Sequence, residues 1–269
     1  MRLLKTSLLA VVALPLLIQA GVQDSAKLRF NVASDQKVTM NIVTDTKTTL
    51  TGMMEEESVT KSTITTVYSF GKKTEDGWMP YSTENTSVKY ESDSDAMGGM
   101  GDPEGSLKTV KTSGEVSDRG ATRNLKVEGI DEMMAMFSEM DPSSKAGIFG
   151  ATYPEEAIKV GSAWEHPVKM QGMVTGEIPF KYEVVAFEDL DGKKTAKIKV
   201  YSSGKLQIDL SSMGAGAGDI TANFSGFMWV DLANGVASKT DMTVGQVMEI
   251  PGMITVTSKG TVKTTAKVN

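Results

Sequence analysis

Alternation of apolar and polar residues runs through most of this chain, and it limits the possible folds more than any other feature. Leu28, Phe30 and Val32 share one face of "KLRFNVAS", and "KVTMNIVT", "FKYEVVAFEDL", "KTAKIKVYSS" and "ANFSGFMWVDL" repeat the pattern. A period of two with polar partners is typical of strands that bury one face and expose the other. Frequent threonine at the polar positions also favours strands. We therefore expect a mainly β protein with a curved antiparallel sheet.

Turn signals separate the alternating runs. Asp76-Gly77, Asp191-Gly192 and Asn234-Gly235 each lie between two strand-like segments. Such pairs supply the positive φ angles of tight hairpins. The sequence predicts one hairpin over residues 182–201 and a meander of long strands overall.

One segment breaks the period of two. In "GIDEMMAMFSEMDP", Ile130, Met133, Met134 and Phe137 recur at i, i+3, i+4 and i+7. This spacing places them on one stripe of a helix. We expect a single short amphipathic helix that lies across the sheet.

The N-terminal segment "MRLLKTSLLAVVALPLLIQAG" has the features of a signal peptide. Arg2 and Lys5 precede an apolar run from Leu8 to Ile18, which is too short to cross a bilayer as a helix. We expect residues 1–20 to be a signal peptide cut after Ala20, and the protein to be exported to the periplasm or the extracellular space. An uncleaved membrane anchor is the alternative.

The remaining residues, 21–269, are expected to form a single β-rich domain, with a sub-boundary near residues 141–155 as an alternative. Loops are expected at 91–105 and 211–219, where glycine and small polar residues gather. The chain has a net charge of −6 and no cysteine. An acidic surface is a poor match for nucleic acid, and disulfides and lipid-modified cysteines are excluded.

No motif points to an enzyme or to a resident cofactor. His166 is the only histidine, and one histidine without cysteine cannot build a usual zinc site. Residues 58–61, "SVTK", match S-x-x-K but lie in a strand-like run without the motifs that accompany it. We therefore expect a non-enzymatic protein without a metal site or cofactor.

Two weaker patterns bear on metal binding. Residues 93–104 follow a calcium-loop pattern except at Met97, where a ligand is required, and no helices flank them. We expect a solvated loop there. The chain has 18 methionines, and "MGGM", "MMAMFSEM" and "MQGM" resemble thioether clusters that select Cu(I). Plain packing and binding of apolar ligands are the other uses of methionine.

The segment "YPEEAIKVGSAWEHPV" resembles a signature of an uncharacterised bacterial family of secreted or lipoprotein-type β-rich proteins. Pro154, Val160, Gly161 and Trp164 match its pattern, and Ser162 replaces the usual acidic residue. The resemblance covers about residues 150–245, and the layout is similar to that of the lipoprotein carriers LolA and LolB, whose own signatures are absent. It implies a half-open β-barrel with an apolar concave face and a helix as its lid.

The same segment has a structural interpretation of its own. Gly161 allows a tight turn, after which Trp164 would pack beneath the sheet and Pro167 would end the excursion. We expect a structural corner rather than an active site.

These observations predict an exported, non-enzymatic β protein that binds an apolar or lipid-like ligand in the groove of a curved sheet. The alternatives are a structural or interaction module of the cell envelope, which would contact envelope proteins without a small ligand, and a copper protein that uses methionine clusters. The oligomeric state is left open. The candidate ligand-binding residues are Met133, Met134, Phe137, Met140, Phe227 and Trp229.

Overall fold

A single antiparallel sheet of eleven strands makes up most of the molecule. The computed structural model describes residues 25–53, 55–94, 102–129, 149–211, 214 and 216–269. The strands lie in the order β5-β4-β3-β2-β1-β11-β10-β9-β8-β7-β6. Their bounds are β1 Lys37–Gly52, β2 Glu56–Phe70, β3 Met79–Ser92, β4 Lys111–Val116, β5 Thr122–Glu128, β6 Ala163–Met170, β7 Val174–Leu190, β8 Lys193–Asp209, β9 Ala217–Asp231, β10 Ala237–Ile250 and β11 Ile254–Val268.

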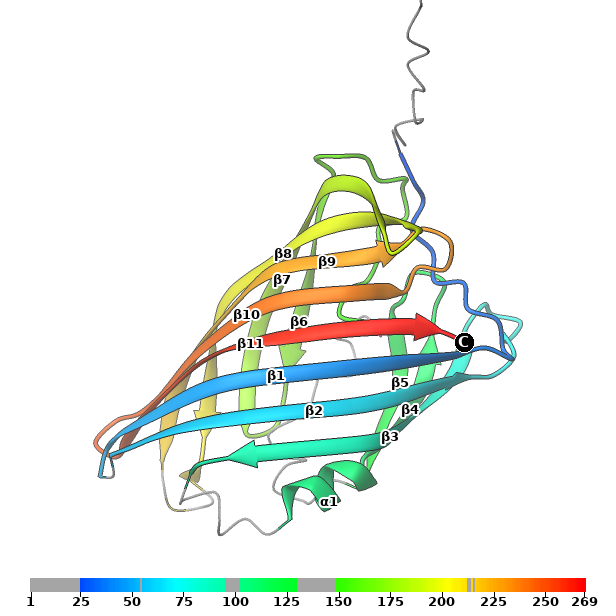
Figure 1. The fold of residues 1–269 in the computed structure, drawn as a ribbon. Coiled ribbons are helices and arrows are strands. Elements are labelled where there is room, and N and C mark those ends of the chain that lie inside the picture. Colours follow the sequence, from blue (N-terminus) through cyan, green and yellow to red (C-terminus); the bar gives the residue numbers. More distant parts are fainter. Residues whose placement is uncertain (1–24, 54, 95–101, 130–148, 212–213, 215) are drawn as a thin grey trace, which may run out of the picture.

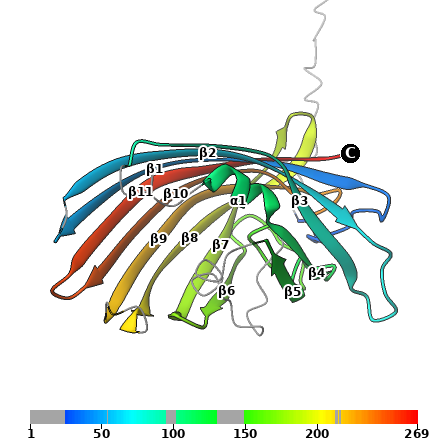
Figure 2. The ribbon, with the colours of Figure 1, turned by 90° about the horizontal axis from the view of Figure 1, so that it is seen from below.

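The sheet is strongly curved and open. Figures 1 and 2 show the long strands bending into an arch with one concave face. The edge strands β5 and β6 do not pair with each other, so the sheet is not closed into a barrel. This confirms the expected mainly β fold with a curved, half-open antiparallel sheet.

Glycines inside the long strands allow neighbouring backbones to approach closely where the sheet bends. Gly260 lies between Thr46 of β1 and Val244 of β10. A Cβ atom at Gly260 would lie 2.2 Å from the carbonyl oxygen of Asp45, and one at Gly226 would lie 2.0 Å from that of Asp241. Any larger residue would therefore push the strands apart.

The predicted turns are confirmed. Asp191 and Gly192 have φ angles of 50° and 78° and join β7 to β8 in the predicted hairpin. Gly77 and Gly235 also have positive φ angles, in the connections from β2 to β3 and from β9 to β10. The left-handed backbone conformation is accessible to glycine without steric penalty.

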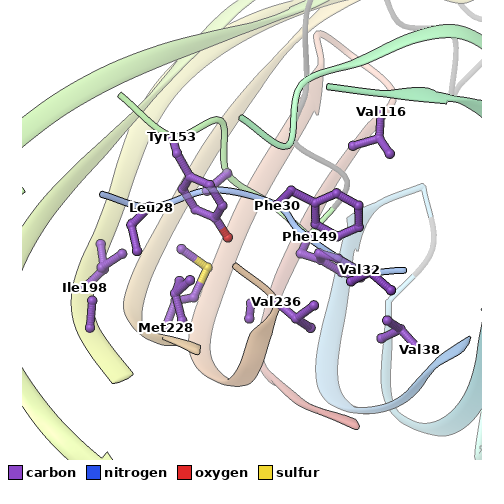
Figure 3. Packing of buried hydrophobic residues seen from close by; sticks show 14 of the residues in the cluster. Leu28, Phe30, Val32, Val38, Val116, Phe149, Tyr153, Ile198, Met228 and Val236 are labelled. Atoms are coloured by element: carbon purple, nitrogen blue, oxygen red, sulfur yellow. The ribbon is translucent and has the colours of Figure 1, made fainter. Parts of the chain in front are cut away.

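Two non-strand segments fill one end of the concave face, and we call them the plug. Residues 25–36 and 149–158 run against the inner surface of the sheet, as Figure 3 shows for Phe30, Phe149 and Tyr153. The two segments are joined by paired backbone hydrogen bonds between Ala26 and Ile158, of 2.8 and 2.7 Å.

One predicted strand belongs to this plug. The alternation in residues 27–34 does bury Leu28, Phe30 and Val32, but the backbone joins no strand of the sheet. Instead the backbone N–H of Phe30 donates to the carbonyl of Asp118 at 2.6 Å. The strand prediction was wrong here because alternation indicates only that one face of a segment is buried. An extended segment can bury one face without pairing with a strand through backbone hydrogen bonds.

The helix that the structure describes differs from the expected one. α1, Pro103–Thr109, lies against β3, and Asp102 caps its first turn by accepting a bond from the N–H of Gly105. The prediction of a loop over 91–105 was therefore wrong at both ends, since β3 extends to Ser92 and α1 begins at Pro103. The predicted helix at residues 129–142 lies outside the described residues, apart from Gly129.

At both edges of the sheet, individual residues disfavour pairing with a further strand. β4 pairs with only the first half of β3, and Glu104 of α1 accepts the backbone N–H of Tyr90 beyond that point, at 2.8 Å. At the other edge Pro167 lies inside β6, opposite Pro179, so it does not end the segment as expected. Proline is tolerated in an edge strand because its missing N–H faces outward.

In the described part of the chain, no helix is long and apolar enough to span a membrane.

Candidate functional site: the concave face

Residue parity separates the two faces of the strands. On β8 the even-numbered Ile198 and Leu206 are buried, whereas Lys199 and Lys205 are exposed. The cross-strand pairing carries this division through the sheet from β7 to β2. The even-numbered residues of these strands form the concave face, except beyond bulges at residues 184–186 of β7 and 237–239 of β10.

One half of the concave face is apolar. Phe180 of β7 and Phe224 of β9 have ring centroids 5.4 Å apart, and Ser202 of β8 lies between them in the register. Met170, Phe180, Phe224 and Met248 are only partly buried, so they present apolar surface to a molecule in the arch. We call this set the apolar half; it comprises Met170, Ile178, Phe180, Leu206, Ile208, Ile220, Ala222, Phe224 and Met248.

The other half of the concave face carries hydroxyl groups. Thr46 faces Thr60, and Thr48 faces Ser58 on β2 and Ser258 on β11. The hydroxyl oxygens of Thr48 and Ser258 lie 3.0 Å apart in a hydrogen bond. We call this set the hydroxyl stripe; its members are all partly buried and comprise Thr44, Thr46, Thr48, Ser58, Thr60, Ser62 and Ser258.

A continuous row of residues connects the two halves. Phe224 faces Val244, Val244 faces Gly260, Gly260 faces Thr46, and Thr46 faces Thr60. Adjacent strands are about 4.8 Å apart, so this row of five residues spans about 19 Å. A single extended molecule can therefore contact both halves.

Charge is almost absent from this surface. Among the described concave-facing residues of β1, β2, β8, β9, β10 and β11, the only charged side chains are Glu56 and Lys194, each next to a hairpin turn. The convex face of the same strands carries ion pairs, including Lys47–Glu57 at 2.8 Å. The sequence thus separates charge from uncharged groups across one sheet.

Farther along β2, beyond Ile64, a small cavity of about 190 Å³ opens between β2, β3 and β4. Burial raises the pKa of Tyr68 to about 12 and that of Tyr81 to about 12, so both remain protonated at neutral pH. The cavity is lined by Thr66, Tyr68, Tyr81, Thr83, Asn85, Val110 and Thr112. All these side chains are uncharged.

The plug closes one end of the concave face with buried hydrogen bonds. The hydroxyl of Tyr153 donates to the carbonyl of Gly235 at 2.8 Å, and the guanidinium of Arg119 donates to the carbonyl of Tyr153 at 2.7 Å. Burial raises the pKa of Tyr153 far above its ordinary value.

The segment around Trp164 is a structural corner, as expected. Gly161 has a φ angle of 84° and donates its N–H to the carbonyl of Val184. The Trp164 ring stacks on Tyr182 with centroids 5.2 Å apart, and its indole N–H donates to Thr152 of the plug at 3.0 Å. This corner fixes the plug to β6 and β7.

The structure places two predicted ligand residues on the opposite side of the sheet. Phe227 and Trp229 lie on the convex face, with the Lys197 ammonium 5.1 Å from each ring centroid. The Trp229 indole N–H donates to Glu188 at 2.6 Å. Met228 between them is buried in the concave core. Phe227 and Trp229 therefore do not meet the apolar half.

The other predicted ligand residues, Met133, Met134, Phe137 and Met140, lie outside the described residues. Phe180, Phe224 and Met248 are not among the predicted ligand residues. The alternation around each of them does show which neighbouring residues share its face of the strand. The missing information was the strand order, which brings β7, β9 and β10 together.

Metal-binding groups do not gather in the described ranges. No three His, Asp or Glu side chains there lie close enough together to hold a metal ion. His166 of β6 lies opposite Phe180 of β7. In the calcium-like loop, Asp93 accepts the N–H of Val59, and Glu104 accepts that of Tyr90, so each has a structural partner.

Comparison with known proteins gives no family. No protein-family model matches the chain, and no curated protein matches it. Among solved structures, lipovitellin aligns at a TM-score of 0.49 with 9% identity, over 89% of this chain and 26% of its own. The chain thus spans about a quarter of lipovitellin.

Porins are also among the solved structures that align with this chain. A mutant porin of Rh. blastica aligns at a TM-score of 0.31 with 10% identity, over 84% of this chain and 99% of the porin. OpdQ of Pseudomonas aeruginosa gives 0.31 and 7%, over 88% and 100%. Likeness this low carries no functional argument.

Proposed function

We propose that this protein is an exported, non-enzymatic binding protein that holds an apolar or lipid-like ligand against the concave face of its sheet. The observation that carries the proposal is the apolar half, where Phe180, Phe224 and Met248 remain partly exposed inside an arch. Binding sites for small molecules are concave and mostly apolar. Apolar side chains placed there gain about 25 cal/mol for each Å² that a ligand covers.

Openness of the sheet supports the same proposal. β5 and β6, the two edge strands, do not pair with each other, and Pro167 in β6 disfavours pairing with a further strand. A sheet that is not closed into a barrel can admit a chain molecule from the side. The plug closes only one end of the concave face, because its contacts are confined to the first core cluster.

A matched pair of variants tests the proposal. Phe224 and Phe227 lie three residues apart on β9 and face opposite sides of the sheet. Phe224→Asp should weaken binding of the uncharged methyl ester of a pyrene-labelled fatty acid by more than about tenfold, because it buries a carboxylate against the ligand. Phe227→Asp should bind the probe like the unmodified protein.

The result is read by fluorescence titration, with thermal unfolding to show that each variant is folded. If Phe224→Asp does not fold, Val256→Asp on the concave face of β11 replaces it, with Thr257→Asp on the convex face as its control. Failure of the unmodified protein to bind the probe, or equal weakening by the substitutions on both faces, would contradict the proposal.

The alternative, an interaction module of the cell envelope, has one observation in its favour. Phe227 and Tyr201 are 38% and 40% exposed on the convex face, close to Lys197 and Lys199. Exposed aromatic side chains are enriched in surfaces that bind other proteins. Retention of an envelope protein by the unmodified chain and its loss in Phe227→Asp would favour this function.

A further inference from the structure

The concave face is divided into an apolar and a hydroxyl-bearing region, and this division specifies a class of ligand. The row from Phe224 through Val244 and Gly260 to Thr46 and Thr60 crosses from one region to the other without a charged residue. A purely apolar ligand would leave the hydroxyl stripe without hydrogen-bond partners from the ligand. An amphiphile would satisfy both regions at once.

The general preference of strands for threonine does not explain why the hydroxyl stripe is almost free of charge. Both faces of β1 and β2 carry threonine, but Asp45, Lys47, Glu57 and Lys61 all lie on the convex face. Charged residues therefore occur often on the convex side of these strands. On the concave side, Glu56 near the tip is the only one among the described residues of the two strands.

This difference determines which head group fits. A phosphate or carboxylate on the stripe would lose water without gaining a cation, and the carboxylate that lies near an ammonium group there, Glu56 at the tip, already accepts a hydrogen bond from the Ser94 hydroxyl. Hydroxyl groups both donate and accept hydrogen bonds, and so match the hydroxyl, ester or amide groups of an uncharged head. The cavity farther along β2 is lined by Val110 and by neutral tyrosine, threonine and asparagine side chains.

We infer that the ligand is an uncharged amphiphile, with its apolar chain on the apolar half and a hydroxyl- or ester-bearing head group on the hydroxyl stripe. The inference rests on the proposed function and adds the chemical class of the ligand.

Three probes with one acyl chain and different head groups test the inference. Monopalmitoylglycerol is neutral, palmitate is anionic and palmitoylcholine is cationic. Calorimetric titration of the full chain, below the concentrations at which the probes form micelles, should give a dissociation constant for monopalmitoylglycerol at least about tenfold lower than for either charged probe.

The outcomes separate the two proposals. Equal or tighter binding of a charged probe would overturn the inference and leave the proposed function standing. Absence of binding by all three probes would overturn both.

A second experiment locates the head group. Thr46→Val with Thr60→Val removes two facing hydroxyls and preserves side-chain shape and β-branching. This variant should weaken monopalmitoylglycerol binding about tenfold and reduce its preference over palmitate. Thr49→Val with Thr63→Val, on the convex face of the same strands, is the control and should leave both affinities unchanged.

Thermal unfolding verifies that both double variants are folded. An unchanged preference for monopalmitoylglycerol in the folded Thr46→Val, Thr60→Val variant would overturn the assignment of the head group to the hydroxyl stripe.

Discussion

The two faces of the sheet are made by alternate residues of the same strands, yet they follow different rules. The convex face pairs lysine with glutamate, as in Lys47–Glu57, Lys169–Glu177 and Lys181–Glu165. The concave face packs apolar groups at its plugged end and presents mostly uncharged groups elsewhere. Since the backbone is shared, the difference comes from side chains alone. It shows that charged side chains and uncharged side chains are assigned to opposite sides of one layer.

The largest expected effect comes from placing a charge at the plugged end of the concave face. Ile198 on β8 has no exposed surface, so Ile198→Asp should lower the free energy of unfolding by about 4 kcal/mol or more. Ser203→Asp, on the exposed convex face of the same strand, should change it by less than about 1 kcal/mol. Urea unfolding measures both values. Similar losses in the two variants would refute the distinction between the faces.

A smaller effect is expected from adding one methyl group within a strand. Gly260→Ala places a Cβ atom 2.2 Å from the carbonyl oxygen of Asp45 and should destabilise the protein by about 2–3 kcal/mol. A Cβ atom at Gly245 on β10 would lie in open space, so Gly245→Ala should be neutral or stabilise by about 0.5 kcal/mol. Midpoints of thermal unfolding rank the variants. Tolerance of Gly260→Ala would show that close strand approach is not needed for the curvature.

Alkaline pH should destabilise the concave side through its buried tyrosines. Burial raises the pKa of Tyr68 and Tyr81 from 10.0 to about 12 and that of Tyr153 still higher. Because the folded state holds these protons more tightly, stability is complete below pH 10 and falls as pH rises toward the folded pKa values. Each group removes up to about 1.4 kcal/mol per pH unit in this window.

Urea unfolding at a series of pH values measures this slope. Tyr153→Phe loses the hydrogen bond to Gly235 and should be less stable at neutral pH, but its stability should fall less steeply above pH 10. An identical slope in this variant would show that Tyr153 does not contribute to the alkaline sensitivity.

The smallest effect is expected from an ion pair on the convex face. The side chains of Lys47 and Glu57 are 57% and 64% exposed, so water and salt screen their attraction. Lys47→Ala should lower the free energy of unfolding by about 0.5 kcal/mol or less, and the difference should shrink in high salt. A loss of several kcal/mol would mean that the convex face also holds the fold together.

Sequence patterns predicted the strands and their turns well because both depend on local rules. Asp191-Gly192 formed the expected hairpin, and the alternation in β8 assigned Ile198 and Lys199 to opposite faces. The alternation in residues 27–34 also identified the buried side chains. It could not show that Leu28 and Phe30 pack from a plug, because the backbone partners at Asp118 and Asn234 are distant in sequence.

The candidate binding surface was harder to predict because it depends on which strands are neighbours. Phe180 and Phe224 are 44 residues apart and meet only through β8. Phe227 and Trp229 were predicted to contact the ligand, yet the register places both side chains on the convex face. The sequence showed which residues of one strand share a face. It did not show which of those faces lie on the same side of the sheet, because that depends on the strand order and on the bulges.

The position of β11 has a consequence for how the protein folds. β1 through β5 form one meander and β6 through β11 another, and the two meet only along the pairing of β1 with β11. Residues 254–268 are synthesised after the other ten strands of this sheet, although they lie in its middle. Until they emerge, β1 and β10 each have an unpaired side, with hydrogen-bonding groups available to other chains. The interval before β11 is synthesised is therefore a period in which this chain is exposed to aggregation.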